Sequence, residues 1–260
     1  MPAASPDGSY SVRMTVEETS TERSAIDDLH WYINKYESSY GQSTLPGADQ
    51  IRRVMSPAAR LRAKQVATNA QARLMRRRAS EMVHGLDQVR LHLGCGWNKL
   101  ADWINVDLVG GKTDLVWDLR RPLPFAPRSV DVIFLEHVFE HMRYSETLTV
   151  LGHLRTTLKP GGVLRVGVPD AGMYAKWYAT DPDSLRTTRW GRPTAMFALR
   201  EVFQEHAHVA AYDAETLILV LEAGGFPGAE VTEPGTSLLL ESVPDMPERW
   251  AETVYVEVRA

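Results

Sequence analysis

The stretch Val89-Arg90-Leu91-His92-Leu93-Gly94-Cys95-Gly96 decides the fold. An apolar run ends in two glycines around one small residue, and a second apolar run, Ile104 to Val106, ends in Asp107. A strand, a small-residue turn and a second strand ending in an acid are typical of Rossmann-type sheets that bind a nucleotide-like cofactor. We expect Gly94 and Gly96 to let the ligand approach the backbone closely. Asp107 is expected to accept hydrogen bonds from both ribose hydroxyls.

The turn differs from the fingerprint of NAD- and FAD-binding proteins. Their third glycine is replaced here by Lys99, and their acid lies roughly 20 residues beyond the turn. The interval from Gly94 to Asp107 is too short for a full crossover helix, so Lys99 to Trp103 is predicted as a loop or a single turn. No helix N-terminus is evident that would bind a pyrophosphate. The pattern therefore favours a cofactor without phosphate groups.

Further motifs follow in order along the chain. They are Trp117-Asp118-Leu119, Pro122-Leu123-Pro124-Phe125, Ser129-Val130-Asp131-Val132-Ile133, Glu136-His137-Val138-Phe139-Glu140-His141, Leu158-Lys159-Pro160-Gly161-Gly162 and Ala223-Gly224-Gly225-Phe226. In this order the chain resembles the class I S-adenosylmethionine-dependent methyltransferases, in particular the bacterial small-molecule group with a short first crossover. The resemblance spans about Val89 to Phe226 and leaves out the N-terminal third.

The resemblance implies an α/β fold with a Rossmann-like, doubly wound, mostly parallel seven-stranded sheet whose last strand is antiparallel. Strand-like patterns occupy Val89 to Leu93, Ile104 to Val106, Val130 to Leu135 and Val163 to Val168. Helical patterns occupy Ser145 to Leu158, stopped by Pro160-Gly161-Gly162, and Ala214 to Ala223. This alternation builds a parallel sheet. Ser237 to Glu241 and Val254 to Val258 are expected to complete it as the antiparallel pair.

The chain divides into a helical N-terminal extension, 1–85, and a methyltransferase domain, 86–260. The start of the extension is polar and predicted to fray, with helices from Ala25 to Tyr40 and from Asp49 to His84. Residues 170–205 follow a strand at the ligand-binding edge of the sheet and carry large side chains: Tyr174, Trp177, Tyr178, Trp190, Met196 and Phe197. We predict a substrate lid here. An extra helical layer with its own small core is a compatible interpretation.

Composition excludes several classes of protein. A chain of 260 residues, 44% hydrophobic, can bury one substantial core. Cys95 is the single cysteine, so an intrachain disulfide and a cysteine-based zinc site are excluded. No apolar run approaches the ~20 residues that span a bilayer, and the N-terminus lacks a signal pattern. We therefore predict a cytoplasmic protein with no membrane partner, and leave a homodimer open.

The second helical region of the extension is basic. After Asp49 it carries Arg52, Arg53, Arg60, Arg62, Lys64, Arg73, Arg76, Arg77 and Arg78 against the single acid Glu81. Such a run can bind an anionic substrate or RNA, or it can be a solvated face packed against the acidic remainder. We favour the solvated face, because charge runs are usually solvated and no aromatic side chains are interleaved for base stacking. With a net charge of −4, a nucleic-acid partner is not expected.

The resemblance also assigns the cofactor contacts. Asp118 is expected to accept a hydrogen bond from the adenine amino group, with Leu119 beside the ring, although Asp is also a common turn cap. Glu136 and His137 are expected to lie near the cofactor's sulfur. Cys95 is expected to line the cofactor site. The predicted set is Leu93, Gly94, Cys95, Gly96, Asp107, Leu108, Asp118, Leu119, Glu136 and His137.

Two polar clusters supply catalytic candidates. His137-Val138-Phe139-Glu140-His141 matches the H-x-x-E-H pattern of zinc metallopeptidases. There the pattern lies inside a helix, whereas here it directly follows a strand, so we predict no metal and keep His141 as a base or acceptor-binding group. The second cluster holds His206, His208 and Tyr212, and resembles the segment that closes the acceptor pocket. The candidates are His208, His141, His137 and Tyr212, with His208 first because its ordinary pKa lies near physiological pH.

The predicted function is transfer of a methyl group from S-adenosylmethionine to an O or N atom of a small-molecule acceptor. Natural products, amino sugars and similar products of biosynthesis are the expected acceptors, and S-adenosylhomocysteine is the by-product. One alternative is an RNA or protein methyltransferase, supported only by the basic helix. The other is a catalytically degenerate binding protein that keeps the fold.

Overall fold

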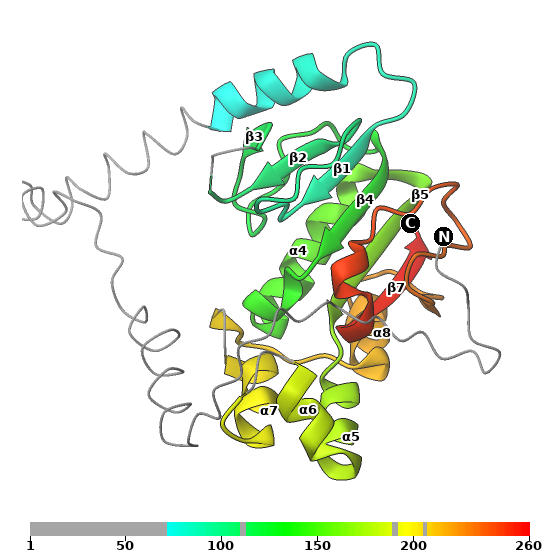
Figure 1. Ribbon diagram of the computed structural model, residues 1–260. Coiled ribbons are helices and arrows are strands. Elements are labelled where there is room, and N and C mark those ends of the chain that lie inside the picture. Colours follow the sequence, from blue (N-terminus) through cyan, green and yellow to red (C-terminus); the bar gives the residue numbers. More distant parts are fainter. Residues whose placement is uncertain (1–71, 110–112, 189–191, 205–206) are drawn as a thin grey trace, which may run out of the picture.

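The computed structural model describes residues 72–109, 113–188, 192–204 and 207–260. Most of the N-terminal extension, with its first predicted helix, therefore lies outside the described residues. Its last part forms a helix at 72–83, which Figure 1 shows in cyan beside the β3–β2–β1 half of the sheet. Ala79 is buried there in the main core, and Met75 and Met82 pack against it.

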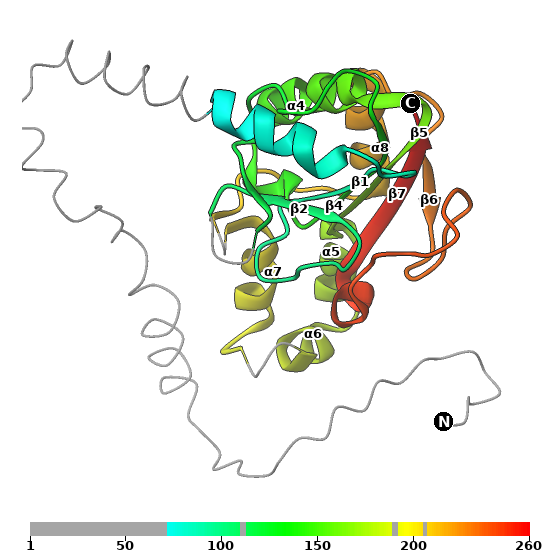
Figure 2. The same cartoon turned by 90° about the horizontal axis from the view of Figure 1, so that it is seen from above.

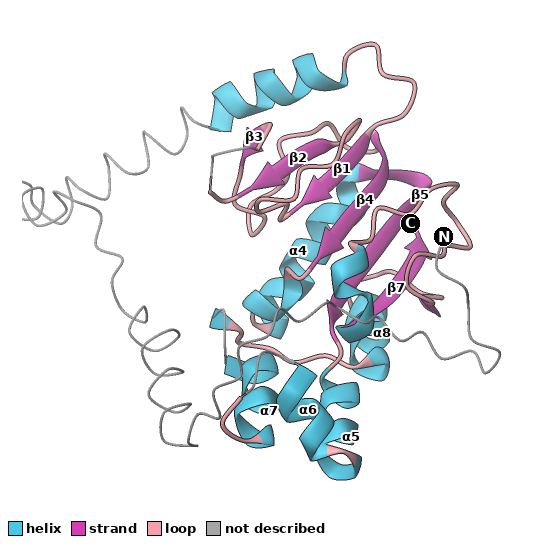
Figure 3. Cartoon of the chain, viewed as in Figure 1, coloured by secondary structure: helices cyan, strands magenta, loops and turns pink. Residues whose placement is uncertain are grey.

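The sheet has seven strands among the described residues. They are β1 (Arg90–Leu93), β2 (Ile104–Asp107), β3 (Leu115–Val116), β4 (Val130–Glu136), β5 (Leu158–Pro169), β6 (Glu230–Thr232) and β7 (Thr253–Arg259). Their order is β3-β2-β1-β4-β5-β7-β6. β7 runs antiparallel to both of its neighbours, whereas the pairs within β3-β2-β1-β4-β5 are parallel. The predicted fold class is confirmed (Figure 3).

The helices at 144–157 and 214–223 follow the sequence patterns closely, whereas the three helices between 171 and 204 were not predicted individually. In chain order these are α4 (Tyr144–Thr157), α5 (Ala171–Thr180), α6 (Pro182–Thr188), α7 (Ala195–Gln204) and α8 (Ala214–Ala223), with 3₁₀ turns η2 (Phe139–His141) and η4 (Pro247–Glu252). α8 has the predicted bounds because Asp213 caps it, its carboxylate accepting a hydrogen bond of 2.8 Å from Thr216 N. α4 and α8 pack against each other (Figure 2). No helix within the described residues is long and apolar enough to cross a bilayer.

The segment 237–241, predicted as a strand, is not one. Ser237 Oγ accepts hydrogen bonds from Leu239 N and Leu240 N, and Glu257 Oε1 accepts one from Leu238 N. Because side chains accept the hydrogen bonds of these backbone N–H groups, the groups are not available for pairing with a neighbouring strand. The neighbour of β7 is instead β6, while the prediction for 254–258 is confirmed.

A second correction concerns β5, which begins at Leu158 and not at Val163. The Pro160-Gly161-Gly162 stretch was predicted to turn the chain after α4. It lies inside the strand, where Gly161 N donates to Ala260 O and Ala260 N donates to Gly162 O, both at 2.8 Å. The register of β4 against β5 shifts between Val130 and Val132 to accommodate it.

The segment between β5 and α8 forms a helical layer with its own core. Tyr174, Leu185, Ala198 and Val202 are buried together, apart from the main core under the sheet. Figure 1 groups α5, α6 and α7 beyond the end of β5. This layer covers the edge of the sheet where parallel α/β proteins bind their ligands.

Candidate active site

The turn after β1 fits closely against the end of β4. Gly94 has a φ of +73°, and a Cβ there would lie 2.3 Å from Val138 Cγ2. Gly94 N donates a hydrogen bond of 2.8 Å to Val106 O. Only glycine therefore fits position 94, and the turn is in direct contact with the segment that follows β4. Gly96 also has a positive φ, +51°, but it faces open space with no atom within 4 Å of a Cβ.

Asp107 lies at the end of β2 beside this open space. Its Oδ2 accepts a hydrogen bond of 2.8 Å from Gly96 N, and its Oδ1 accepts one of 3.0 Å from Val109 N. Around it stand exposed apolar side chains, Trp97 at 82% exposure together with Leu108 and Val109. An acid flanked by an open glycine and exposed apolar side chains suits a ribose with an attached base. The arrangement fits an adenosyl cofactor.

The remaining residues predicted to bind the cofactor differ in burial and in their hydrogen bonds. Leu93 and Leu119 are buried in the main core. The carboxylate of Asp118 accepts hydrogen bonds of 2.9 and 3.1 Å from the Arg120 guanidinium. Cys95 is buried, and burial together with the charge of Asp107 raises the pKa of its thiol to about 11. A thiol this basic is no nucleophile at neutral pH.

Glu136 ends β4 as part of a buried hydrogen-bond network. Its Oε1 accepts hydrogen bonds from Tyr255 Oη at 2.6 Å and Met246 N at 3.0 Å. Arg249 Nη1 lies 3.4 Å from Oε2. Burial raises the pKa of Glu136 above its ordinary value. The side chain thus anchors the segment leading into η4 to the end of β4.

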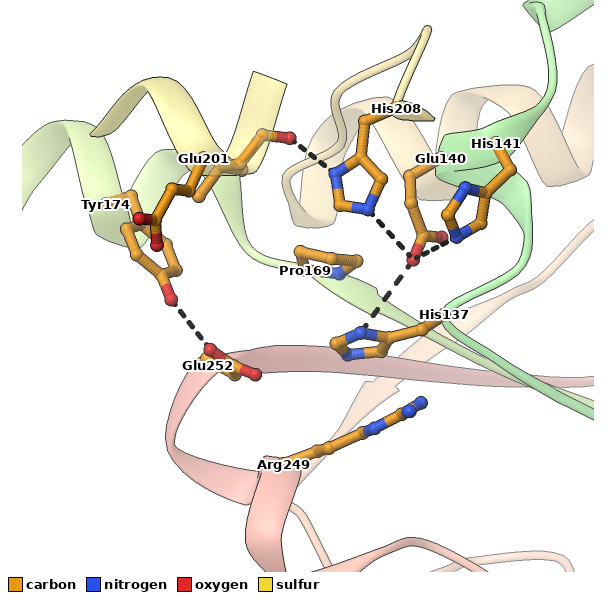
Figure 4. Close-up of a pocket in the computed structure, with 10 residues that line it drawn as sticks. His137, Glu140, His141, Pro169, Tyr174, Glu201, His208, Arg249 and Glu252 are labelled. Atoms are coloured by element: carbon orange, nitrogen blue, oxygen red, sulfur yellow. Dashed lines mark hydrogen bonds and ion pairs between the residues drawn. The ribbon is translucent and has the colours of Figure 1, made fainter. Parts of the chain in front are cut away.

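A cavity of about 360 Å³ opens at the carboxyl ends of β4 and β5. It is lined by residues from both strands' ends, from α5, α7 and η4, and from the segment before α8: His137, Glu140, His141, Pro169, Tyr174, Glu201, Val202, His208, Arg249 and Glu252. Figure 4 shows the three histidines converging on the Glu140 carboxylate. Three of the four candidate catalytic residues, His137, His141 and His208, therefore meet in one cavity.

The Glu140 cluster comprises Glu140, His137, His141 and His208. Glu140 Oε1 lies 3.8 Å from His137 Nδ1, 3.9 Å from His141 Nε2 and 3.9 Å from His208 Nε2. Glu140 is 1% exposed, and neither carboxylate oxygen has a hydrogen-bond partner. Burial raises the pKa of Glu140 to about 8. Burying a carboxyl group without hydrogen bonds costs free energy. This cost indicates that Glu140 has a role besides packing.

His137 is placed by the turn that leaves β4. Its φ is +56°, a conformation that is rare for residues other than glycine and is often found at functional sites. The turn is fixed by a hydrogen bond of 2.9 Å from His137 N to Gly167 O. Nε2 contacts Thr253 Oγ1 on β7 at 2.8 Å, which leaves Nδ1 toward Glu140.

His208 reaches the same carboxylate from a distant part of the chain. Val209 N and Ala210 N donate hydrogen bonds of 2.8 and 3.1 Å to the backbone carbonyl of Glu140. The Nδ1 of His208 donates to Val202 O at 2.9 Å, so its Nε2 carries the lone pair that faces the Glu140 carboxylate. The backbone thus delivers this histidine to the cluster in a defined tautomer.

Other candidates from the sequence lie elsewhere. Tyr212 is buried in the main core with its hydroxyl 3.2 Å from Thr147 Oγ1, and it does not line the cavity. His206 lies outside the described residues. Sequence reasoning placed Tyr174 in the lid without a role, and it missed Arg249 and Glu252, whose carboxylate accepts a hydrogen bond of 2.7 Å from the Tyr174 hydroxyl at the cavity wall. Nothing near these residues in the sequence resembles a motif, because tertiary contacts alone bring them to the site.

Part of the chain matches a known protein family. Residues 66–166 match the family model described as a methyltransferase domain, and this segment supplies the cofactor turn, Asp107 and the Glu140 cluster except His208. This part of the chain is a methyltransferase domain. No protein among the curated sequences matches the chain.

Several solved methyltransferase structures are similar to this chain. An S-adenosylmethionine-dependent methyltransferase from Archaeoglobus fulgidus is 16% identical over 74% of this chain and 94% of its own, with a TM-score of 0.44. One from Thermotoga maritima is 14% identical over 77% and 96%, with a TM-score of 0.42. One from Mesorhizobium loti is 13% identical over 66% and 90%, with a TM-score of 0.36. These similarities leave the acceptor of this methyltransferase undefined.

S-adenosylmethionine is the cofactor of this enzyme, and when bound it supplies an electrophilic methyl group on a sulfonium. We expect Asp107→Asn to raise the dissociation constant of S-adenosylhomocysteine by roughly 10- to 100-fold, since it removes charge-assisted hydrogen bonds to the ribose. Isothermal titration calorimetry measures this change. Asp87→Asn, at an exposed acid before β1, is the matched control. A change below about 3-fold in Asp107→Asn, within the precision of such titrations, would place the ribose elsewhere.

Proposed function

We propose that this methyltransferase acts on an O or N atom of a small-molecule acceptor bound in the cavity at the Glu140 cluster. The observation that carries the proposal is the contact between Val138 and Gly94, which joins the cofactor turn to the segment bearing His137 and Glu140. The cavity volume of about 360 Å³ lies within the range of small-ligand sites. Cofactor and acceptor sites are therefore neighbours at one edge of the sheet.

The reaction needs a group that takes a proton. The acceptor atom attacks the methyl carbon in line, a new bond to carbon forms, and the bond from sulfur to carbon breaks with its electron pair left on sulfur. A hydroxyl acceptor also loses its proton. His208 Nε2 carries a lone pair toward the cavity, and the Glu140 carboxylate 3.9 Å away would stabilise the positive charge that the imidazole gains with the proton. A group of this kind within hydrogen-bond reach of the acceptor acts as a general base.

The lining favours a polar acceptor. Arg249, Glu252 and Tyr174 also line the cavity, and their charges and hydroxyl suit an acceptor with several hydroxyl or amino groups, such as an amino sugar. The helical layer contributes Tyr174, Glu201 and Val202 to the lining. We assign this layer, the predicted lid at 170–205, the role of covering the acceptor and excluding water.

An RNA acceptor finds less support. Of the basic residues in the extension, Arg73, Arg76, Arg77 and Arg78 are described, and all four are exposed on the helix at 72–83. That helix lies at the other end of the molecule from α5, α6 and α7 (Figure 1). Arg77 pairs with Glu81 at 2.9 Å. These charges form a solvated helix face remote from the cavity.

The test is the fate of a labelled methyl group. The enzyme is incubated with methyl-labelled S-adenosylmethionine and, separately, with amino sugars and aminoglycosides, hydroxylated aromatic compounds, total RNA and a protein extract. We expect label in one of the small-molecule classes. Label in RNA or protein alone would overturn the proposal. Tight binding of S-adenosylhomocysteine without transfer to any acceptor would favour the degenerate binding protein.

A further inference from the structure

The Glu140 cluster has the composition and arrangement of a metal site. One carboxylate oxygen faces three imidazole nitrogens at 3.8 to 3.9 Å. The ligand atoms of Glu140, His141 and His208 all lie within 4.8 Å of one another. Two ligands bound to one zinc ion at ~2.1 Å each are about 3.4 Å apart in a tetrahedral site. Small side-chain rotations would bring the present separations to that value.

The carboxylate gives an independent reason to expect a ligand. Glu140 is buried, its two oxygens accept no hydrogen bond, and the side chain points into the cavity. Figure 4 shows it at the centre of the histidines. Buried carboxylates in proteins are paired, hydrogen-bonded or bound to metal. The histidines alone stand too far away for hydrogen bonds, and a cation between them and the carboxylate would supply the missing partner.

Outer contacts orient two of the histidines. His208 Nδ1 donates to Val202 O at 2.9 Å, so the lone pair is on Nε2, which faces Glu140. His137 Nε2 contacts Thr253 Oγ1 at 2.8 Å, and its Nδ1 lies 3.8 Å from Glu140 Oε1. Histidines that bind metals characteristically use the other ring nitrogen in this way, to a carbonyl, carboxylate or polar group. The backbone hydrogen bonds from Val209 N and Ala210 N to Glu140 O hold the segment that carries His208 next to Glu140.

We propose that Glu140, His141 and His208, with His137 beside them, bind one divalent transition-metal ion of the zinc class. Imidazole suits Zn²⁺, Co²⁺, Ni²⁺ and Fe²⁺, and two histidines with one carboxylate leave coordination positions open for a further ligand. This departs from the expectation of no metal, which relied on the H-x-x-E-H pattern lying outside a helix. The structure brings His208 to the pattern as a ligand that the pattern itself does not contain.

The consequence for the reaction rests on the proposed function. With three protein ligands, the ion would keep a coordination position for a hydroxyl oxygen of the acceptor and would lower the pKa of that hydroxyl. The hydroxyl proton would leave to solvent, the oxygen would attack the methyl carbon, and the sulfur would keep the electron pair of the broken bond. With the ion bound, the metal would replace His208 in activating the hydroxyl, and His208 and Glu140 would act as its ligands. The proposal narrows the acceptor to a hydroxyl compound.

The test measures binding of the ion without cofactor or acceptor, so its outcome is independent of methyl transfer. Full-length enzyme without a histidine tag is stripped with EDTA, dialysed and titrated with Zn²⁺ by calorimetry and with Co²⁺ by visible absorption. We expect one ion per chain, and a cobalt spectrum without a thiolate charge-transfer band because Cys95 lies outside the cluster. Absence of stoichiometric binding in the unmodified enzyme would overturn the proposal without any variant.

Variants locate the site. Glu140→Gln and His208→Ala should each weaken binding of Zn²⁺ by more than about 100-fold, beyond the effect of losing an outer-shell partner. His84→Ala, at an exposed histidine, should bind as the unmodified enzyme does. Retained affinity for S-adenosylhomocysteine shows that each variant is folded. Unchanged zinc affinity in both Glu140→Gln and His208→Ala would place the ion elsewhere and overturn the assignment.

Discussion

Replacing Glu140 by glutamine should lower kcat for methyl transfer by about 10² to 10⁴-fold, the range expected for loss of a group that handles the acceptor's proton. The carboxylate is the point on which three histidines converge. Glutamine keeps the size of the side chain and the backbone carbonyl that binds Val209 and Ala210. The loss would therefore reflect chemistry at the carboxylate.

The measurement is the initial rate of labelled methyl transfer to the acceptor that the labelling test identifies. Affinity for S-adenosylhomocysteine should change by less than about 3-fold, a fraction of a kcal/mol, because Glu140 lines the cavity and is not among the residues predicted to bind the cofactor. Glu222→Gln, at an exposed glutamate on α8, is the matched control. A Glu140→Gln rate close to that of Glu222→Gln would remove the carboxylate from the reaction.

Replacing Arg165 by methionine should lower the free energy of unfolding by about 3 to 5 kcal/mol. Arg165 lies on β5 and is fully buried. Its guanidinium donates to Asp245 at 2.7 and 2.5 Å and to Glu257 at 3.1 Å, and lies 5.1 Å from the centre of the Tyr255 ring. Methionine would leave two buried carboxylates without their cation.

Urea unfolding followed by circular dichroism measures the effect. Arg259→Met, at an exposed arginine on the adjacent strand β7, should cost less than about 1 kcal/mol. Adding Asp245→Asn and Glu257→Gln to Arg165→Met should recover part of the stability, since the uncompensated charges are then removed. Equal stability of Arg165→Met and Arg259→Met would show that the buried charges are compensated in another way.

This ion cluster also bears on the site. Asp245 accepts a hydrogen bond from Gly235 N at 3.0 Å, and the next residue, Met246, donates to Glu136. The cluster therefore ties the long segment between β6 and β7 to the sheet. That segment contains η4, which delivers Arg249 and Glu252 to the cavity.

Local patterns were sufficient to predict most of the fold. The apolar run before Gly94 and the acid after the second run predicted β1, β2 and the turn, because each signal lies within a few residues. Asp213 and Gly224 bound α8 in the same local way. The segment 237–241 was misassigned, because its apolar character is local while the Glu257 carboxylate that captures it comes from β7.

The residues of the site likewise fall into those that a local pattern predicts and those that tertiary contacts bring together. His137 and His141 could be found because they stand in one short pattern after a strand. Their meeting with His208 depends on hydrogen bonds between the Glu140 carbonyl and a segment about 70 residues further along the chain, and no short-range pattern encodes such a contact. The burial of Glu140 without hydrogen bonds is likewise a property of the folded chain alone.

A crystal structure of the enzyme with S-adenosylhomocysteine would show directly whether the cofactor and the Glu140 cluster share one edge of the sheet. We expect a ribose on Asp107, the backbone of Gly94 to Gly96 against the ligand, and a sulfur directed at the cavity that holds the Glu140 cluster. A sulfur facing away from that cavity, or a ligand bound at another edge of the sheet, would contradict it.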